Sequence, residues 1–165
     1  MKETAVLASC LDNARQLTRF YLSKLKIVDP LGRYELTPDC SINSYYWIIG
    51  HLCWAENLLV LKNLGVQPLV KYDWLDSFSL GRTDGIQEGM PDFSVVLEAF
   101  KQIHQQSLVA IQEFDEESLD KDSTLEFNFG NGSSIREILK HAIRHESVHT
   151  GHLGLLCKIS GINTI

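Results

Sequence analysis

Apolar side chains recur every three or four residues through long segments of this chain, and this spacing constrains the fold most. In the segment of residues 2–25 the recurring positions include Leu7, Leu11 and Leu25. Similar patterns cover residues 92–114 and 134–160, and residues 39–63 form the most apolar segment. A period near 3.6 residues is typical of amphipathic α-helices that bury one face. We therefore expect four helices and an all-α fold.

Capping residues indicate where two of these helices begin and end. Asp39 or Ser41 is the expected N-cap of the second helix, and Gly65 is expected to end it. Ser134 and Glu137 form an S-x-x-E capping box at the start of the fourth helix, and Gly161 follows its end.

The lengths of the helices and their connections favour one architecture. Helices of about 20–27 residues are roughly 30–40 Å long, the dimension of a four-helix bundle. The glycine-containing connection of residues 65–91 is long enough to cross the bundle, which would make the second and third helices parallel. Residues 125–129 alternate in polarity and predict a short extended segment. We expect residues 1–165 to form a single domain.

Composition excludes several classes of function. The 15 Lys and Arg residues are outnumbered by 21 Asp and Glu, and no basic cluster occurs, so we expect no nucleic-acid partner. No run of apolar residues is long enough to span a membrane, and the first residues lack a signal-peptide pattern. We expect a cytoplasmic protein without a membrane partner. The four cysteines form no CxxC pair, and we expect them to be reduced and mostly buried.

The histidines of the fourth segment are its most informative feature. His141, His145, His149 and His152 occupy an arc of about 80° on a helix. They coincide with the apolar seam, so we expect all four imidazoles to point inward. Any one of them alone would most often be a packed, hydrogen-bonded core residue. For the set, a divalent metal that accepts a lone pair from each neutral ring is the better explanation.

Distance along the helix limits which histidines can share an ion. His141 and His149 are about 12 Å apart along the axis, too far for one ion. The pairs 141/145, 145/149 and 149/152 remain open, and each needs a third ligand from a facing helix. His51 is the best candidate for that ligand, because it lies in the second helix and points with Trp47 and Ala55.

Residues 145–149 also match the H-E-x-x-H pattern of zinc proteases, with Glu146 in the place of the general base. The longer form of that motif requires glycine where His152 stands. We therefore reject the protease hypothesis and expect Glu146 to lie on the helix surface or at an interface.

Two segments carry a family resemblance. Residues 43–56 have the sequence NSYYWIIGHLCWAE, and residues 145–153 have the sequence HESVHTGHL. They are similar to the second-helix and fourth-helix signatures of the DinB-like (damage-inducible) family. The resemblance implies a four-helix bundle with a crossover, frequent homodimers and a mid-bundle metal, often zinc or nickel. It implies His51, His145 and His149 as the metal ligands. The sequence departs from the family pattern at Thr150, where a basic residue is usual, and at His152, where glutamine is usual.

A three-histidine site leaves one coordination position for water or for a thiolate. A bound water would suit a hydrolase. The resemblance also implies a bound thiolate, because relatives include low-molecular-weight thiol transferases and thiol-dependent isomerases. We therefore expect an enzyme acting on a small molecule, with a non-catalytic metal-binding or metal-stabilised bundle as the alternative.

Large apolar residues predict a cavity wall and an interface between two copies of the chain. Trp47, one turn before His51, and Trp74, in the long connection, are candidates for the wall of a cavity. Trp54, Leu58 and Leu61 make the second helix more apolar than one core face requires, which favours a homodimer.

Overall fold

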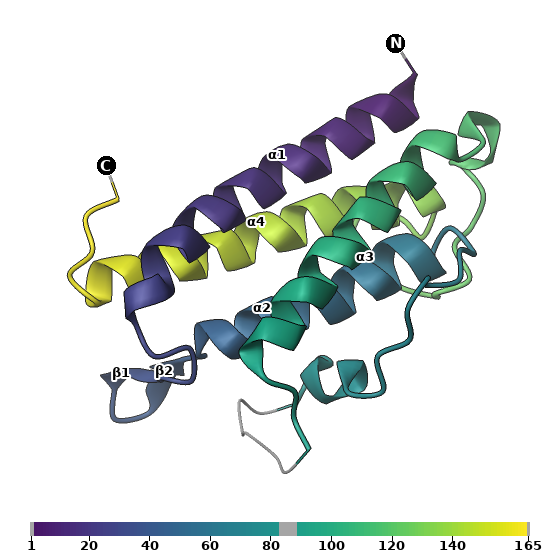
Figure 1. The fold of residues 1–165 in the computed structure, drawn as a ribbon. Helices are drawn as coiled ribbons and strands as arrows, with labels where there is room; N and C mark the ends of the chain where they lie inside the picture. Colours follow the sequence, from purple (N-terminus) through teal and green to yellow (C-terminus); the bar gives the residue numbers. More distant parts are fainter. Residues whose placement is uncertain (1, 83–88, 165) are drawn as a thin grey trace.

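Four α-helices form a bundle in the computed structural model, which describes residues 2–82 and 89–164. The helices are α1 (Glu3–Lys24), α2 (Tyr45–Glu56), α3 (Phe93–Glu113) and α4 (Ile135–Ile159) (Figure 1). This confirms the all-α fold and the four-helix architecture expected from the periodicity.

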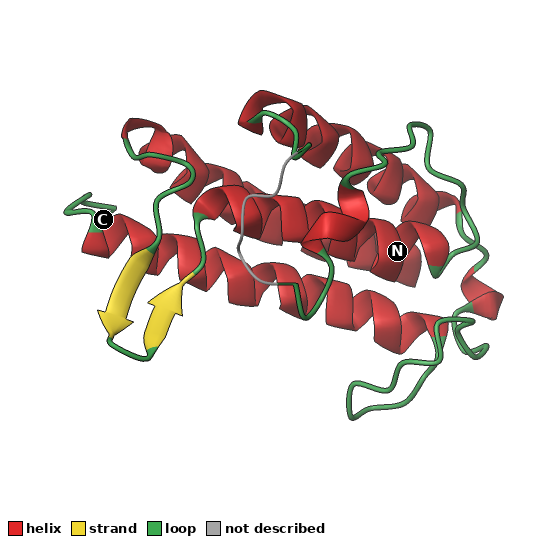
Figure 2. Ribbon diagram, turned by 90° about the horizontal axis from the view of Figure 1, so that it is seen from below, coloured by secondary structure: helices red, strands yellow, loops and turns green. Residues whose placement is uncertain are grey.

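The connection between α2 and α3 crosses the length of the bundle, as expected. In Figure 1, α1 and α4 run in one direction, whereas α2 and α3 run in the other. The most extensive packing is that of α1 against α4 and of α2 against α3. Because the two helices of each pair run in the same direction, both pairs are parallel. Figure 2, in which the bundle is seen from below, shows the described part of this connection in front of the helices, with one short helical turn at Leu75–Phe78.

The start of α2 differs from the sequence expectation. Residues 34–42 form a hairpin of strands β1 (Tyr34–Thr37) and β2 (Cys40–Ile42), in which Ser41 pairs with Glu35. The expected N-caps, Asp39 and Ser41, are therefore wrong, because the turn and second strand of the hairpin hold them. Ser44 is the N-cap, and its hydroxyl accepts a hydrogen bond from the backbone N–H of Trp47 at 3.2 Å.

The other helix ends agree closely with expectation. The π-helical turn Asn57–Lys62 continues α2, and Gly65 follows it in the left-handed conformation that glycine adopts without strain. The Ser134 hydroxyl accepts a hydrogen bond from the Glu137 backbone N–H, so this N-cap is confirmed.

The expected extended segment at residues 125–129 is not a strand. Only one isolated bridge, between Asp122 and Ser134, pairs backbone near it in the described part of the chain. Residues 2–82 and 89–164 supply no strand beside this segment, and side chains such as Phe129 pack onto the helices instead.

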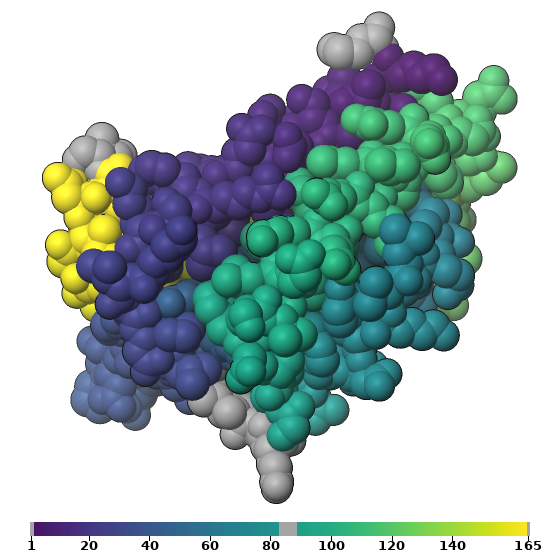
Figure 3. All heavy atoms as spheres, viewed as in Figure 1, coloured from purple at the N-terminus to yellow at the C-terminus, as the bar shows by residue number. Residues whose placement is uncertain are grey.

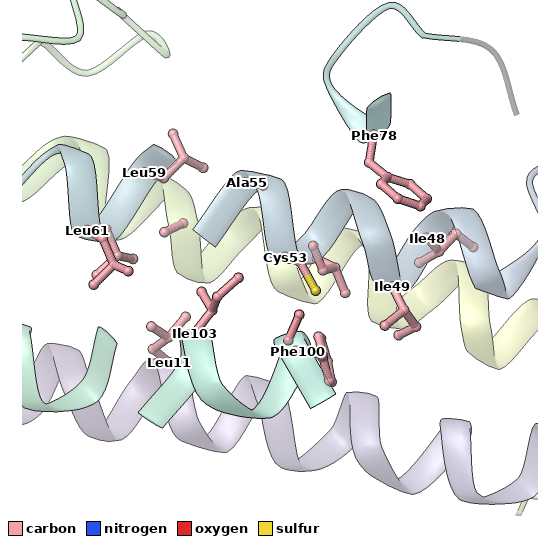
Figure 4. Close-up of a cluster of buried hydrophobic side chains, with 14 of the residues drawn as sticks. Leu11, Ile48, Ile49, Cys53, Ala55, Leu59, Leu61, Phe78, Phe100 and Ile103 are labelled. Atoms are coloured by element: carbon pink, nitrogen blue, oxygen red, sulfur yellow. The ribbon is translucent and has the colours of Figure 1, made fainter. Parts of the chain in front are cut away.

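The core lies between the four helices and extends under the crossover. Figure 4 shows Phe78 reaching from the crossover towards α2, above the buried side chains of Cys53, Phe100 and Ile103. On the outer face seen in Figure 3, side chains of α1 and α3 meet directly. The crossover therefore contributes to the core, as a fixed part of the fold.

The cysteines are all free, but only Cys53 and Cys157 are buried. The expectation of mostly buried thiols is thus wrong for Cys10, on the outer face of α1, and for Cys40, in the hairpin. Within the described residues, no helix combines the length and the apolarity needed to cross a membrane.

Candidate metal centre

His51 of α2 meets His145 and His149 of α4 in the middle of the bundle. One ring nitrogen from each of the three lies within 4.8 Å of the others. Of the three histidine pairs that helical spacing left open, the structure thus brings 145/149 together with His51. This cluster can hold a metal ion, and it comes from two helices that are far apart in the sequence.

Three neighbours hold the His51 ring in place. Its Nδ1 lies 2.7 Å from the backbone carbonyl oxygen of Phe78, which can only accept, so Nδ1 carries the proton. The ring also stacks between Trp47, at 4.7 Å, and Trp54, at 5.6 Å between centroids. With Nδ1 donating, Nε2 is left with its lone pair and faces Nε2 of His145 at 3.2 Å.

The surroundings keep all three imidazoles neutral. Burial lowers the pKa of His51, although the Phe78 carbonyl opposes this shift. Burial and the neighbouring His51 and His141 lower the pKa of His145 to about 4. Burial, His145, His51 and His152 lower the pKa of His149 to about 2. Neutral rings have the free lone pairs that a metal requires.

The donor set fits a divalent transition metal. Imidazole nitrogen suits zinc and nickel, and metal-bound histidines usually donate their second N–H to a carbonyl or carboxylate. His51 already makes such a bond to Phe78. The lone pair of His51 Nε2 faces Nε2 of His145 at 3.2 Å, so without a metal the His145 ring must donate its proton there, and a bound cation could take the place of that proton.

The other two histidines of α4 have different surroundings. His141 is half-buried and stacks on Phe129, with ring centroids 3.5 Å apart. His152 is exposed, with its Nδ1 3.3 Å from Nδ1 of His149. The expectation that all four rings point inward is therefore wrong for His152. The physical reason is that the most buried line of α4 passes through Glu146 and Thr150.

A buried ionic network next to the histidines explains this rotation of α4. Arg15 of α1 is fully buried and donates through Nε and Nη2 to the two carboxylate oxygens of Glu146, at 2.8 and 3.0 Å. The Thr18 hydroxyl donates to the same carboxylate at 2.6 Å. The predicted surface position of Glu146 is therefore wrong. Because Arg15 and Thr18 occupy its carboxylate, Glu146 is not placed as the general base of a zinc protease.

The network continues to a second carboxylate on α2. Arg15 also donates to Glu56 at 2.6 Å, and the other oxygen of Glu56 lies 2.8 Å from Nδ1 of His104. Nε2 of His104 in turn lies 3.2 Å from Asp12 at the surface. Burial raises the pKa of Glu56, but Arg15 and His104 outweigh it, so the net shift is downward. Four helices thus meet in one polar cluster.

Two cavities flank the histidine cluster. One, of about 270 Å³, lies between α2 and Phe129 and includes His51, His145 and Trp54 in its wall. The other, of about 330 Å³, lies between the hairpin and α4 and includes His149 and His152. The metal-ligand candidates therefore have open space on two sides.

Trp47 and Trp74 were the candidate wall residues. Trp47 stacks on His51 and lines neither of the two flanking cavities, so the structure does not place it in their walls. Trp74 contacts Tyr72 and Phe78 within the crossover.

Sequence reasoning missed the contribution of the crossover to the site. Phe78 supplies the carbonyl that orients His51, and its ring rests against Gly50, where any Cβ would overlap it. A glycine inside the most apolar helix was the available signal, because glycine is unfavourable there unless another group approaches closely.

Comparison with known proteins agrees with this architecture. The family model of the DinB superfamily matches residues 11–153. A search of curated proteins found no match. The matched region contains His51, His145 and His149 together with nearly all of the bundle. The chain therefore belongs to the DinB superfamily.

Proposed function

We propose that this protein is a metal-dependent enzyme that promotes attack on a small molecule by water or by a low-molecular-weight thiol. His51, His145 and His149 would hold one divalent ion, with zinc and nickel as the first candidates. The observation that carries the proposal is the convergence of three neutral imidazoles from two helices within 4.8 Å.

A bound divalent ion would supply Lewis acidity and would lower the pKa of a coordinated water or thiol. The chain's own residues provide the rest of the site. Phe78 and the two tryptophans fix the direction of His51, and three neutral donors add no negative charge. An anionic fourth ligand is therefore favoured. The flanking cavities give that ligand and a substrate room to approach.

We also propose a homodimer in the cytoplasm. The apolar residues of α2 and the following turn that first suggested dimerisation give no support, since Leu61 is buried and Trp54 and Leu58 line a cavity within one chain. Support comes instead from α1, where Val6, Leu17 and Phe20 are 38–49% exposed and fall within an arc of about 60°. Free thiols at exposed positions suit a reducing compartment.

Cobalt substitution tests the catalytic proposal. Cobalt-loaded protein is titrated with bacillithiol, mycothiol, glutathione and cysteine, and a thiolate-to-cobalt charge-transfer band is expected with at least one. Cys40 lies in the wall of the cavity that includes His149, so the titration is repeated with Cys40→Ser to exclude a band from the protein's own thiol. Ester and amide hydrolysis is assayed in parallel.

Two results separate the alternatives. A band that persists in Cys40→Ser supports thiol transfer, whereas turnover of an ester or amide supports hydrolysis. If no thiol binds, no ester or amide is cleaved and His152 completes a closed four-coordinate site, the enzyme proposal fails in favour of a metal-stabilised bundle.

A further inference from the structure

We infer that the cavity between α2 and Phe129 binds a neutral aromatic or compact aliphatic group, which forms the body of the substrate. The inference rests on the proposed function, because it assigns to this cavity the molecule that would be attacked at the metal. It concerns the 270 Å³ cavity, called here the aromatic cavity.

The wall of the aromatic cavity has one chemical character. Its described residues are aliphatic or aromatic, except for three imidazoles, and none carries a formal charge. Phe129 and His141 stack almost parallel, at 8°, and form a flat wall opposite α2. Flat apolar surfaces without charge favour a neutral ring and disfavour a charged or strongly hydrated group.

The size of the cavity sets an upper limit on this group. A cavity of about 150 Å³ lined by apolar side chains is sufficient for benzene. The aromatic cavity, at about 270 Å³, therefore has room for one substituted ring or for a branched aliphatic group of similar bulk. Leu80, at one edge, is 82% exposed, so the cavity opens to solvent there.

The position of the cavity connects it to chemistry at the histidines. His51 and His145 belong both to its wall and to the metal-ligand cluster, so a bound ring would contact two of the residues that would hold the ion. The second cavity approaches the cluster from His149 and contains Ser41, Asn43 and Cys40. These residues alternate with aliphatic ones, so the lining of the second cavity is mixed. Apart from its imidazoles, the described lining of the aromatic cavity consists of apolar side chains alone, so the apolar group is assigned to it.

A binding measurement that needs no turnover tests this inference. The affinity of 4-fluorobenzyl alcohol is measured by fluorine NMR for metal-free and zinc-loaded protein, with 2-fluoroethanol as a polar probe of small size. Leu58→Trp should fill the aromatic cavity and weaken binding of the aromatic probe at least tenfold. Phe129→Ala, which removes the flat wall, should weaken it as well. Leu155→Trp fills the second cavity instead and is the matched control.

Preference for the aromatic probe, lost in Leu58→Trp and Phe129→Ala but retained within twofold in Leu155→Trp, supports the inference. Equal binding of both probes, or loss only in Leu155→Trp, overturns it. Metal content, measured on the same samples, separates the two proposals. Aromatic binding by protein that takes up no zinc would refute the metal site alone, and zinc uptake without aromatic binding would refute the cavity assignment alone.

Discussion

Nδ1 of His51 donates a hydrogen bond of 2.7 Å to the backbone carbonyl of Phe78, which joins the metal-ligand candidate on α2 to the crossover. The Phe78 side chain strengthens this link, because its fully buried ring packs on Gly50, the residue before His51. The long connection thus fixes the tautomer and direction of an imidazole in the site. Loss of a group that accepts a hydrogen bond from a metal-binding histidine typically lowers metal affinity about 10–100-fold.

Replacing Gly50 by alanine tests the link. The new Cβ would overlap the Phe78 ring, so the crossover must move away and the carbonyl must leave His51. We expect Gly50→Ala to lower the free energy of unfolding by about 1–3 kcal/mol and to weaken zinc binding about tenfold or more. Urea denaturation and a competitive zinc titration measure the two effects.

Gly151→Ala is the matched control for this substitution. Gly151 also lies inside a helix, but a Cβ there meets no atom within 4 Å. We expect it to stabilise the protein by about 0.5–1 kcal/mol, because alanine favours the helix. Unchanged zinc affinity in both variants would show that Phe78 does not orient His51.

His149→Ala should abolish stoichiometric binding of zinc or nickel, because two imidazoles remain where three converge. His152→Ala removes an exposed imidazole of the same helix and should retain one ion per chain. Elemental analysis after dialysis provides the readout. Equal metal content in His149→Ala and wild type would disprove the ligand assignment, and loss of metal in His152→Ala would add His152 to the ligands.

Arg15→Met should be the most destabilising of these changes. It leaves the carboxylates of Glu56 and Glu146 buried without their cation. Breaking a buried ion pair in this way costs about 3–5 kcal/mol. Arg19→Met, on the exposed face of the same helix, should change stability by less than about 0.5 kcal/mol. Similar urea midpoints for the two variants would contradict a structural role of the network.

Periodicity was sufficient to predict α1, α3 and α4, because each of them buries one face. Nearly all of α2 is buried, so its apolar content predicted the helix but not the residue at which it begins. For the site, helical spacing left three histidine pairs open, and the resemblance to the family motifs selected His51, His145 and His149 from them. The exact rotation of α4 could not be predicted. A ranking of residues by hydrophobicity predicts that the histidines of α4 lie in the core and that Glu146 lies outside it. In the structure Glu146 is buried, because it pairs with Arg15, which is 131 positions away in the sequence.

The hairpin and the crossover were harder to predict for a different reason. Residues 34–42 are short and their exposed strands pair only with each other, so little apolar alternation marks them. The role of Phe78 depends on a backbone carbonyl, which no side-chain pattern can reveal.

Acid should destabilise the metal-free protein through the histidine cluster. The folded state lowers the pKa of His145 to about 4 and that of His149 to about 2, from an ordinary value of 6.5. Below pH 6.5 the unfolded chain therefore binds protons that the folded chain does not, and the free energy of unfolding falls as the pH falls. Between pH 6 and 4.5 the expected slope is about 1.4 kcal/mol per pH unit for each of these two groups.

This slope is measured by urea denaturation of chelator-treated protein at a series of pH values. His149→Gln, which cannot be protonated, should lower the slope by the contribution of one group. Val148→Gln changes the exposed neighbouring position without removing a titratable group, so its slope should equal that of wild type. A stability that stays constant from pH 7 to 4.5, or equal slopes in His149→Gln and wild type, would show that the imidazoles are not held neutral by their surroundings. Neutral imidazoles are the state that metal binding at this cluster requires.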